Sequence, residues 1–365
     1  METMKILFVN NARVCSGCED HLLDLAVWMR EHGVQPVFLV REGSILHDRC
    51  AILGIAAYPV FNPDRKLGLL YRIARAVLAE QPDVISINRE HNILPVTAAT
   101  MLIHPFLKKK PKMVAVFHAP TGRWYPGLAK FHGLIGTSVY TAAPFISKNP
   151  GIQEKIEVIH YGITIPPVDA EAKLVRERPR KYFRDRKFPI IAMVGELWKN
   201  QEEMVDVGRL LVGKFPEITI AFIGGYHESR TLKAKIDASG IPDRFIWTGR
   251  LGRELIPDVF HDLDLSVSTH RNEGFGIVHI ESLAGLTPVV AYNSGGLVEI
   301  IEKGGGVLVD GGTEDFARAV IDLLSDDDRR FRLGIEGRRV VEENFSINAM
   351  GNKHLAFYKN LFHGQ

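Results

Sequence analysis

The sequence of 365 residues has few cysteines, no long hydrophobic run and almost no net charge, and each absence excludes a class of protein. Three cysteines, Cys15, Cys18 and Cys50, are too few, and odd in number, for the disulfide framework of a secreted protein. No stretch reaches the ~20 apolar residues that span a bilayer, and the apolar run 6–9 is too short for a signal peptide. A surplus of two positive charges gives no overall field that would attract nucleic acid. We therefore expect a cytoplasmic protein that binds no nucleic acid, with peripheral contact at the inner membrane face left open.

The composition that remains is typical of a globular enzyme or binding protein. Hydrophobic residues make up 46% of the chain and charged residues 24%, and the length suits about two domains. Short apolar runs alternate with stretches whose apolar residues recur at helical spacing. The runs are 5–9, 34–40, 83–87, 113–118 and 134–138 in the first half, and 189–195, 217–225, 244–249, 263–269 and 287–292 in the second. Because apolar strands separated by helices form parallel sheets covered on both faces, we predict an α/β protein with two doubly wound domains.

Residues 166–188 separate the two halves. They carry prolines and a dense run of charges without a sustained apolar face, so we interpret them as an interdomain linker. This interpretation leaves 1–165 as the first domain and 189–346 as the second. Ligands of doubly wound sheets bind at the carboxyl ends of the strands, so we expect a cleft where these ends of the two domains face each other.

The most informative segment of the second half is 270–296. Glu273 lies in the loop between the predicted strand 263–269 and a predicted helix over 276–286. Gly274 and Gly276 flank the start of this helix, where free N–H groups and the helix dipole suit a phosphate. Glu281 follows on the helix, roughly 8–12 Å from Glu273, which suits a long ligand such as a nucleotide sugar better than the pair of a hydrolase, about 5 Å apart in retaining and about 6.5–9.5 Å apart in inverting enzymes. Solvated glutamates around a loop glycine are the alternative interpretation.

The residues EGFGIVHIE, followed by PVVAYNSGGLVE, resemble the signature of the family-four retaining glycosyltransferases of the GT-B fold. The similarity extends to SGCEDHLLDLA near the start, to VIHYGI at 158–163 and to the closing helix. It implies two facing Rossmann-like domains, with a C-terminal helix of about 347–365 crossing back to the first. It also implies transfer of a sugar from a nucleotide diphosphate donor without a metal or another cofactor. The donor would bind the second domain and the acceptor the first.

The roles of the family's site residues carry over where the match holds. Glu273 resembles the glutamate that contacts hydroxyls of the donor sugar, and Glu281 resembles the one that binds the ribose. Gly295 and Gly296 resemble the paired glycines that line the cleft. The resemblance implies catalytic roles for Glu273, His118 and Lys199, as positioning and charged groups, with no covalent nucleophile assigned. The other donor-binding positions it implies are Gly17, Gly195, Gly249, Arg250, Leu251, Gly274, Phe275, Gly276 and Ile277.

The segment GELWKNQ, 195–201, departs from the family pattern. Lys199 matches the phosphate-binding lysine only if two residues are deleted, and Glu196 stands where the family has an arginine. A carboxylate beside a diphosphate is repulsive and weakens stabilisation of the leaving group. Lys199 alone would then carry the charge, or another cation would enter the site, with Arg250 and Arg271 as the two candidates.

Two interpretations compete for the loop before the first helix. Ser16 and Glu19 have the spacing of a helix capping box, and Gly17 resembles a glycine that faces the donor. Cys15 and Cys18 form a C-x-x-C between a strand and a helix, as in thiol redox proteins. Against a redox role, the chain is far longer than a thioredoxin domain, and a zinc site would need more ligands than these cysteines and His21 supply.

Polar and basic residues elsewhere in the first half are candidates for the sugar and the acceptor. His118 ends the predicted strand 113–118, where the family has a histidine near the reactive carbon of the donor sugar; a structural histidine is the alternative. Asn88, Arg89 and Glu90 follow the strand 83–87, on a rim where an acceptor could sit. The lysines of 108–112 follow the apolar stretch 102–107, which fits either a solvated helix end or a patch facing a membrane.

Together these features predict a retaining glycosyltransferase. The donor would be a UDP-sugar by preference or a GDP-sugar, and the acceptor a glycan, a lipid-linked molecule or a small molecule. The alternatives are a nucleotide-sugar-binding protein without activity and a thiol redox protein that uses Cys15 and Cys18.

Overall fold

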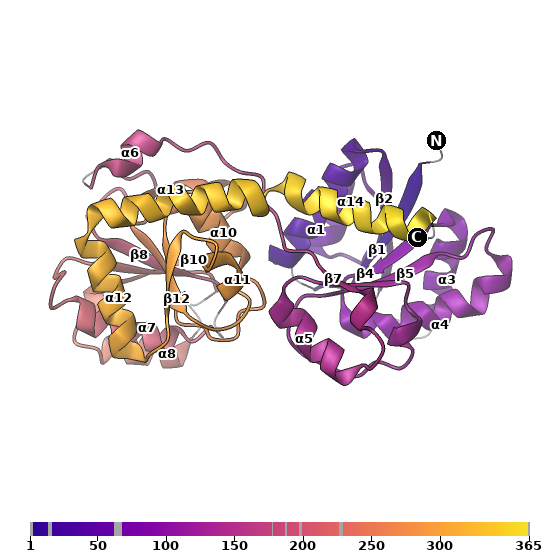
Figure 1. Ribbon diagram of the computed structural model, residues 1–365, viewed down its shortest axis with the longest axis horizontal. Coiled ribbons are helices and arrows are strands. Elements are labelled where there is room, and N and C mark those ends of the chain that lie inside the picture. Colours follow the sequence, from indigo (N-terminus) through magenta and orange to yellow (C-terminus); the bar gives the residue numbers. More distant parts are fainter. Residues whose placement is uncertain are drawn as a thin grey trace. The chain divides into compact units, whose positions relative to one another are not determined.

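The chain forms two compact α/β units, of which the computed structural model describes residues 3–13, 17–61, 68–176, 178–186, 188–196, 199–225 and 229–363. The first unit comprises Met1–Ile163 and Ile347–Gln365, and the second comprises Thr164–Ser346. Each is built around its own parallel sheet (Figure 1).

The first sheet has seven strands in the order β3-β2-β1-β4-β5-β6-β7, all pairing in parallel. The strands are β1 (Met4–Asn10), β2 (Val34–Arg41), β3 (Ala56–Phe61), β4 (Val84–Ile87), β5 (Lys112–Phe117), β6 (Gly133–Gly136) and β7 (Ile156–Val158). The apolar runs of the sequence correspond to β1, β2, β4, β5 and β6. The strands β3 and β7 lie at the two edges, where partial exposure removes the continuous apolar run that marks a buried strand.

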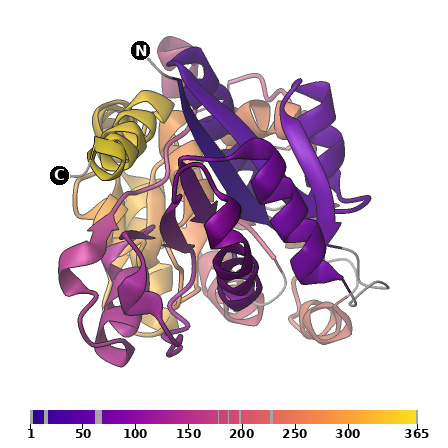
Figure 2. The ribbon, with the colours of Figure 1, turned by 90° about the vertical axis from the view of Figure 1, so that its right-hand side faces the viewer.

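Helices cover both faces of this sheet (Figures 1 and 2). They are α1 (Gly17–Glu31), α2 (Ile45–Ile52), α3 (Leu69–Glu80), α4 (Ile93–Ile103), α5 (Val139–Lys148) and α14 (Ile347–His363). The C-terminal helix α14 packs on α1, and the two meet where Gly351 lies against Trp28: a Cβ on Gly351 would come within 2.4 Å of the indole. The indole Nε1 also donates to Asn348 Oδ1 at 2.7 Å. These contacts attach the last helix to the first unit.

The second sheet has six parallel strands in the order β10-β9-β8-β11-β12-β13. They are β8 (Ile190–Val194), β9 (Thr219–Ile223), β10 (Phe245–Gly249), β11 (Leu265–Ser268), β12 (Val289–Tyr292) and β13 (Gly306–Val309). The helices are α6 (Ala170–Leu174), α7 (Gln201–Leu211), α8 (Arg230–Asp237), α9 (Ile256–Asp262), α10 (Ile277–Ala284), α11 (Val298–Ile301), α12 (Thr313–Ser325) and α13 (Asp327–Asn344). Side chains of α7, α8 and α12 fill the core on one face, and those of α9 pack in a separate core cluster.

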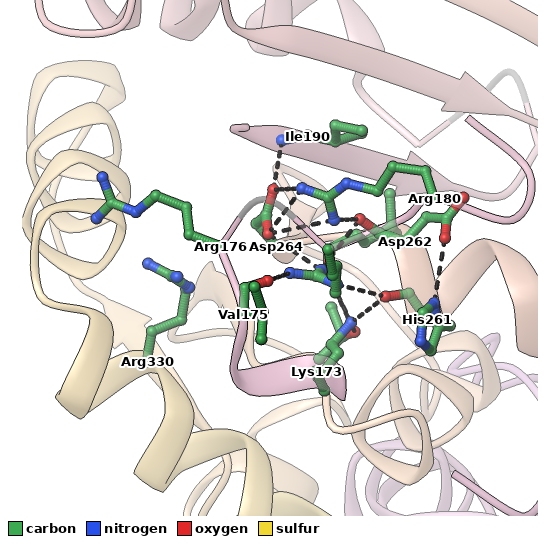
Figure 3. Close-up of polar contacts among 12 residues, drawn as sticks. Lys173, Val175, Arg176, Arg180, Ile190, His261, Asp262, Asp264 and Arg330 are labelled. Atoms are coloured by element: carbon green, nitrogen blue, oxygen red, sulfur yellow. Dashed lines mark hydrogen bonds and ion pairs between the residues drawn. The ribbon is translucent and has the colours of Figure 1, made fainter. Parts of the chain in front are cut away.

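The segment 166–188, interpreted above as a linker, is part of the second unit. Figure 3 shows Lys173 and Arg180 of this segment beside His261, Asp262 and Asp264. Its buried Lys173 donates to the carbonyl oxygens of Phe260 and Leu263, each at 2.7 Å, at the end of α9. Its Arg178 and Arg180 form buried ion pairs with Asp264, each at 3.1 Å. The last carbonyls of a helix lack intrahelical donors and favour cations, so Lys173, Arg178 and Arg180 face the protein and fasten the segment to the end of α9.

Candidate functional site

Three loops at one edge of the second sheet carry the principal candidate residues, because the carboxyl ends of parallel strands meet at the same edge. Lys199 lies in the loop between β8 and α7, and Glu273 lies in the loop between β11 and α10. The Lys199 ammonium is 2.6 Å from Glu273 Oε2, and the two side chains are only 13% and 11% exposed. The structure therefore brings the two predicted residues together as a largely buried ion pair.

The ion pair sets the charge state of Glu273. Burial by itself would raise the pKa of this carboxyl, but the adjacent Lys199 ammonium outweighs burial and lowers the pKa below its ordinary value. His279 and His270 act in the same direction with smaller effect. A carboxylate and a cation thus lie side by side at the sheet edge.

Glycines of the three loops make this approach sterically feasible. Gly195 has φ +148°, and a Cβ there would lie 2.7 Å from Lys199 Cδ. Gly276 begins α10 with φ +102°, and a Cβ would lie 2.9 Å from the ring of His279. Gly295 has φ +76°, and a Cβ would lie 2.7 Å from the carbonyl oxygen of Glu273, which also accepts from Gly296 N at 2.7 Å. A side chain at any of these positions would displace a site residue or strain the backbone.

The other predicted residues of this loop and helix divide into anchors and surface groups. The Phe275 side chain is buried, with its ring 5.6 Å from that of Phe345, so it anchors the loop in the core. Gly274, Ile277 and Glu281 are partly exposed, with Glu281 on α10 beyond Gly276.

The end of β10 supplies a cation next to Glu196, the carboxylate that stands where the family pattern has an arginine. β10 ends at Gly249, with φ +71°, and Leu251 packs partly buried against a core cluster. The Arg250 guanidinium lies 2.7 Å from Glu196 Oε1, and both side chains are about half exposed. The other candidate cation, Arg271, instead pairs with Glu203 at 2.7 Å. Arg250 is therefore the cation that neutralises Glu196.

His118 follows β5 in the first unit, at the edge where that sheet's strands end. It bonds through Nδ1 to the Tyr161 hydroxyl. Burial, reinforced by Arg89, lowers the pKa of His118 to about 4, so the imidazole is neutral at physiological pH. A small cavity beside it is lined by Cys18, His21, Leu22, Leu25, Asn88, Val116, His118, Thr137, Ile159, Tyr161, Met350 and His354.

The loop before α1 is described only in part. Gly17 is the exposed first residue of α1, whereas Cys15 and Ser16 lie outside the described residues, and with them the C-x-x-C and the capping box. The buried Glu19 carboxylate accepts from Asn10 Nδ2 at 3.0 Å and pairs with Arg89. Glu90 accepts from the hydroxyls of Thr121 (2.9 Å) and Tyr125 (3.0 Å). The rim residues Arg89 and Glu90 are thus held by neighbouring side chains.

Two residues near the Lys199–Glu273 pair, His279 and Glu203, were not predicted from the sequence. His279, within α10, is 2% exposed, and burial lowers its pKa to about 4. Its Nδ1 is buried without a hydrogen-bond partner among the described residues. Glu203, in the first turn of α7, contacts the loops that carry Lys199 and Glu273. Local sequence pattern points to neither residue: His279 occupies a buried position of α10, and the hydrogen bonds of Glu203 to Arg271, Tyr292 and Thr313 join residues far away in the chain.

Two family models match most of the chain. The model of glycosyl transferases group 1 matches residues 175–340, and that of Glycosyltransferase Family 4 matches residues 15–165. The chain therefore belongs to the group 1 and family 4 glycosyltransferases, and the predicted GT-B fold class is confirmed.

Individual relatives are similar over part of their length. The 2-deoxystreptamine glucosyltransferase of Streptomyces kanamyceticus is 25% identical over 251 residues, covering 66% of this chain and 62% of that protein. A GDP-mannose-dependent α-(1-6)-phosphatidylinositol monomannoside mannosyltransferase of Mycolicibacterium smegmatis is 29% identical over 197 residues, covering 51% of this chain and 50% of its own. The chain thus spans less than two thirds of the length of these relatives. The structure of Anabaena HepE with UDP and glucose superposes with a TM-score of 0.81 at 19% identity, covering 98% of this chain and 100% of that one.

None of the helices among the described residues is both long and apolar enough to cross a bilayer. No group of three or more His, Cys, Asp or Glu residues in the described ranges is arranged to hold a metal ion.

Proposed function

We propose that this glycosyltransferase transfers a sugar from a nucleoside diphosphate donor with retention at the anomeric carbon. The observation that carries the proposal is the buried Lys199–Glu273 pair, 2.6 Å apart at the start of a helix. A sugar nucleotide presents hydroxyls and a diphosphate next to each other, and a carboxylate beside an ammonium matches this pair of groups. The second unit would bind the donor, and the first would supply contacts to the acceptor.

The charge arrangement assigns each residue a part. Lys199 and the N–H groups at Gly274, Phe275 and Gly276 would stabilise the diphosphate as its bond to the anomeric carbon breaks, since a helix start favours anions. Glu273 would hold sugar hydroxyls and Glu281 the ribose. We assign no covalent nucleophile, so rate enhancement would come from positioning and charge stabilisation.

His118 of the first unit would complete the contacts to the sugar. Its neutral imidazole can donate or accept one hydrogen bond to a hydroxyl without drawing the anionic diphosphate away. Gly17, Gly195, Gly249, Leu251 and Ile277 would line the donor through their backbone.

A UDP-sugar is the favoured donor, because HepE, of similar fold, is named with UDP and glucose. A GDP-sugar is the second choice, because one relative is named as GDP-mannose-dependent. A thermal-shift panel of UDP, GDP, ADP and dTDP, followed by UDP-glucose and GDP-mannose, distinguishes them. Stabilisation by one diphosphate is expected; no stabilisation by any would overturn the proposal, and binding without turnover would identify a nucleotide-sugar-binding protein.

Retention and metal independence each have a direct test. The anomeric configuration of the product, determined by NMR coupling constants, should match that of the donor sugar. Activity should survive EDTA, because Lys199 and Arg250 supply cationic charge at the site. Inversion, or loss of activity with EDTA and its recovery with Mg²⁺, would contradict these parts.

A second feature, the outer face of α4, favours a lipid-linked acceptor at an anionic membrane. Ile93, Val96, Ala99 and Ile103 of α4 are buried, and yet the opposite face is also apolar and exposed. That face consists of Leu94, Ala98, Met101 and Leu102, and it continues into Pro105 and Phe106 of the short turn that follows α4. Leu102 and Phe106 are 66% and 72% exposed. Helices on a protein surface are normally polar on the outside.

The charges next to this face fit an anionic lipid surface. Lys108, Lys109 and Lys110 follow directly and are exposed, and residues 91–112 contain no Asp or Glu. An apolar face flanked by lysines binds bilayers by burying apolar side chains in the lipid and by the attraction of the lysines to anionic headgroups. Co-sedimentation with phosphatidylglycerol vesicles should exceed that with phosphatidylcholine vesicles, and Leu102→Asp should abolish it. Equal sedimentation with both, or no effect of the substitution, would refute this surface.

A further inference from the structure

The carboxylate of Glu203 joins the ends of four neighbouring strands of the second sheet. Glu203 Oε2 accepts from Asn200 Nδ2, after β8, and from Arg271 Nη1 at 2.7 Å, after β11. Its Oε1 accepts from Arg271 Nη2 at 3.2 Å, from the hydroxyl of Tyr292 at the end of β12, and from Thr313 Oγ1 at 3.3 Å, after β13. Five hydrogen bonds saturate a carboxylate, which has about four lone-pair sites.

The cluster is charged and rigid. Burial would raise the pKa of Glu203, but hydrogen bonds from Arg271, Tyr292 and Asn200 outweigh burial and lower it. The hydrogen bond to Glu203 in turn raises the pKa of Arg271. The Arg271 guanidinium also stacks on Tyr292, 3.6 Å from the ring centroid. Bidentate and stacked contacts fix a guanidinium in one orientation.

Both residues of the candidate catalytic pair lie next to this cluster in the chain. Lys199 precedes Asn200, whose backbone has φ +63° and whose carbonyl accepts from Thr269 Oγ1 at 2.8 Å. Glu273 follows Arg271 by two residues. The two loops are therefore joined by the Lys199–Glu273 ion pair, by Glu203, and by the hydrogen bonds between Asn200 and Thr269.

We propose that Glu203 is a positioning residue that fixes Lys199 relative to Glu273, and so relative to the departing diphosphate; this inference rests on the proposed function. Glu203 itself would touch neither sugar nor phosphate. Its loss would remove the link from Arg271 to the β8–α7 loop and let the Arg271–Glu273 part of the β11–α10 loop shift relative to Lys199. A displacement of about 1 Å at a reacting centre costs on the order of 100-fold in rate.

The test compares Glu203→Gln with Glu202→Gln. Glutamine keeps the shape but replaces one accepting oxygen with an amide that cannot accept. Glu202, on the same turn, bonds instead to Thr231 Oγ1 of α8 at 3.4 Å and provides the matched control. Using UDP-glucose or GDP-mannose, whichever the wild type turns over, we expect kcat of E203Q to fall about 100-fold with donor KM changed less than about fivefold, and E202Q to match the wild type. Equal kinetics for E203Q and wild type would overturn the proposal.

A double-mutant cycle separates positioning from a general loss of stability. If Glu203 acts through Lys199, the variant K199M/E203Q is no slower than K199M; multiplied effects would overturn the proposal. Should E203Q fail to fold, as judged by circular dichroism, Arg271→Lys replaces it in the cycle, because lysine keeps the charge but loses the bidentate fork.

A crystal structure of E203Q gives a readout independent of activity. We expect the Lys199–Glu273 hydrogen bond to be broken there, and an unchanged 2.6 Å pair would refute the positioning role. A wild type that turns over no nucleotide sugar would instead refute the proposed function while leaving this structural result interpretable.

Discussion

Replacing Lys199 by methionine should separate the two tasks of the Lys199–Glu273 pair, which are to hold charge in a buried place and to assist the departing diphosphate. Methionine fills similar space but leaves the Glu273 carboxylate, only 11% exposed, without its cation. Removing one partner of a buried ion pair costs about 3–5 kcal/mol in unfolding free energy. We expect K199M to be destabilised by this amount at pH 7.

The pH dependence identifies the cause. In the wild type the pKa of Glu273 is lowered, so this carboxylate stabilises the fold above its unfolded pKa, and the contribution disappears as pH falls through the folded pKa. Without Lys199 the burial of Glu273 dominates and raises its folded pKa above the unfolded value. The penalty of K199M is then largest at neutral pH and shrinks as the carboxyl is protonated in acid. Urea unfolding followed by circular dichroism at pH 7 and pH 4.5 measures the difference.

The double variant K199M/E273Q provides the control for this reasoning. It contains neither charge, so its stability at pH 7 should return to within about 1 kcal/mol of the wild type. Its transfer activity should not return, because removing one donor to a developing anion costs about 100- to 1,000-fold in kcat. K199M as stable as the wild type at pH 7, or a double variant as unstable as K199M, would refute the assigned electrostatics.

Three further predictions concern other charged groups. R250E places two carboxylates beside the donor and should lower kcat/KM at least about tenfold in steady-state kinetics. The double variant E196R/R250E restores a pair of opposite charges and should recover much of the activity. A fully active R250E would exclude Arg250 from the site. Burial lowers the pKa of His279 to about 4, so between about pH 4 and 6.5 the folded state binds fewer protons than the unfolded state, and the free energy of unfolding decreases as the pH falls through this window. H279N should flatten the dependence in urea unfolding from pH 7 to pH 4, and a parallel curve would contradict it. D262N weakens a carboxylate that accepts from the amides of three consecutive residues, Lys181, Tyr182 and Phe183; a loss of about 2–4 kcal/mol is expected in urea, and wild-type stability would show that the segment 166–188 is held by other contacts.

The sequence predicts the fold wherever a strand is buried on both faces. β8 and β12 are almost entirely apolar, and β11, although it contains two serines, is buried at every position; the sequence predicts each of the three to within a few residues. β13 carried no prediction, because its first three residues are only partly buried at the sheet edge. The linker interpretation failed for a different reason. Basic residues at 173–180 read as solvated, since the carbonyl groups of α9 that accept from them are more than 80 residues away in the chain.

The same distinction applies to the site. The sequence predicts the positions of Glu273, Gly274 and Gly276, because a strand, a glycine loop and a helix follow one another within ten residues. This local pattern alone places the three residues at a sheet edge. The role of Glu203 cannot be predicted from local sequence, because its contacts to Arg271, Tyr292 and Thr313 join residues that are 68, 89 and 110 positions apart.

The charge of Glu196 is balanced by a residue that is distant in the sequence. Read along the chain, a carboxylate replaces a cation there, and the site lacks a positive charge. In the sheet, β10 lies two strands from β8 and brings Arg250 to within 2.7 Å of Glu196. A diphosphate responds to the sum of nearby charges, whichever strand supplies each one. The net charge near the diphosphate therefore depends on the ends of β8 and β10 together. The paired substitution E196R/R250E, which exchanges the two charges, tests this dependence.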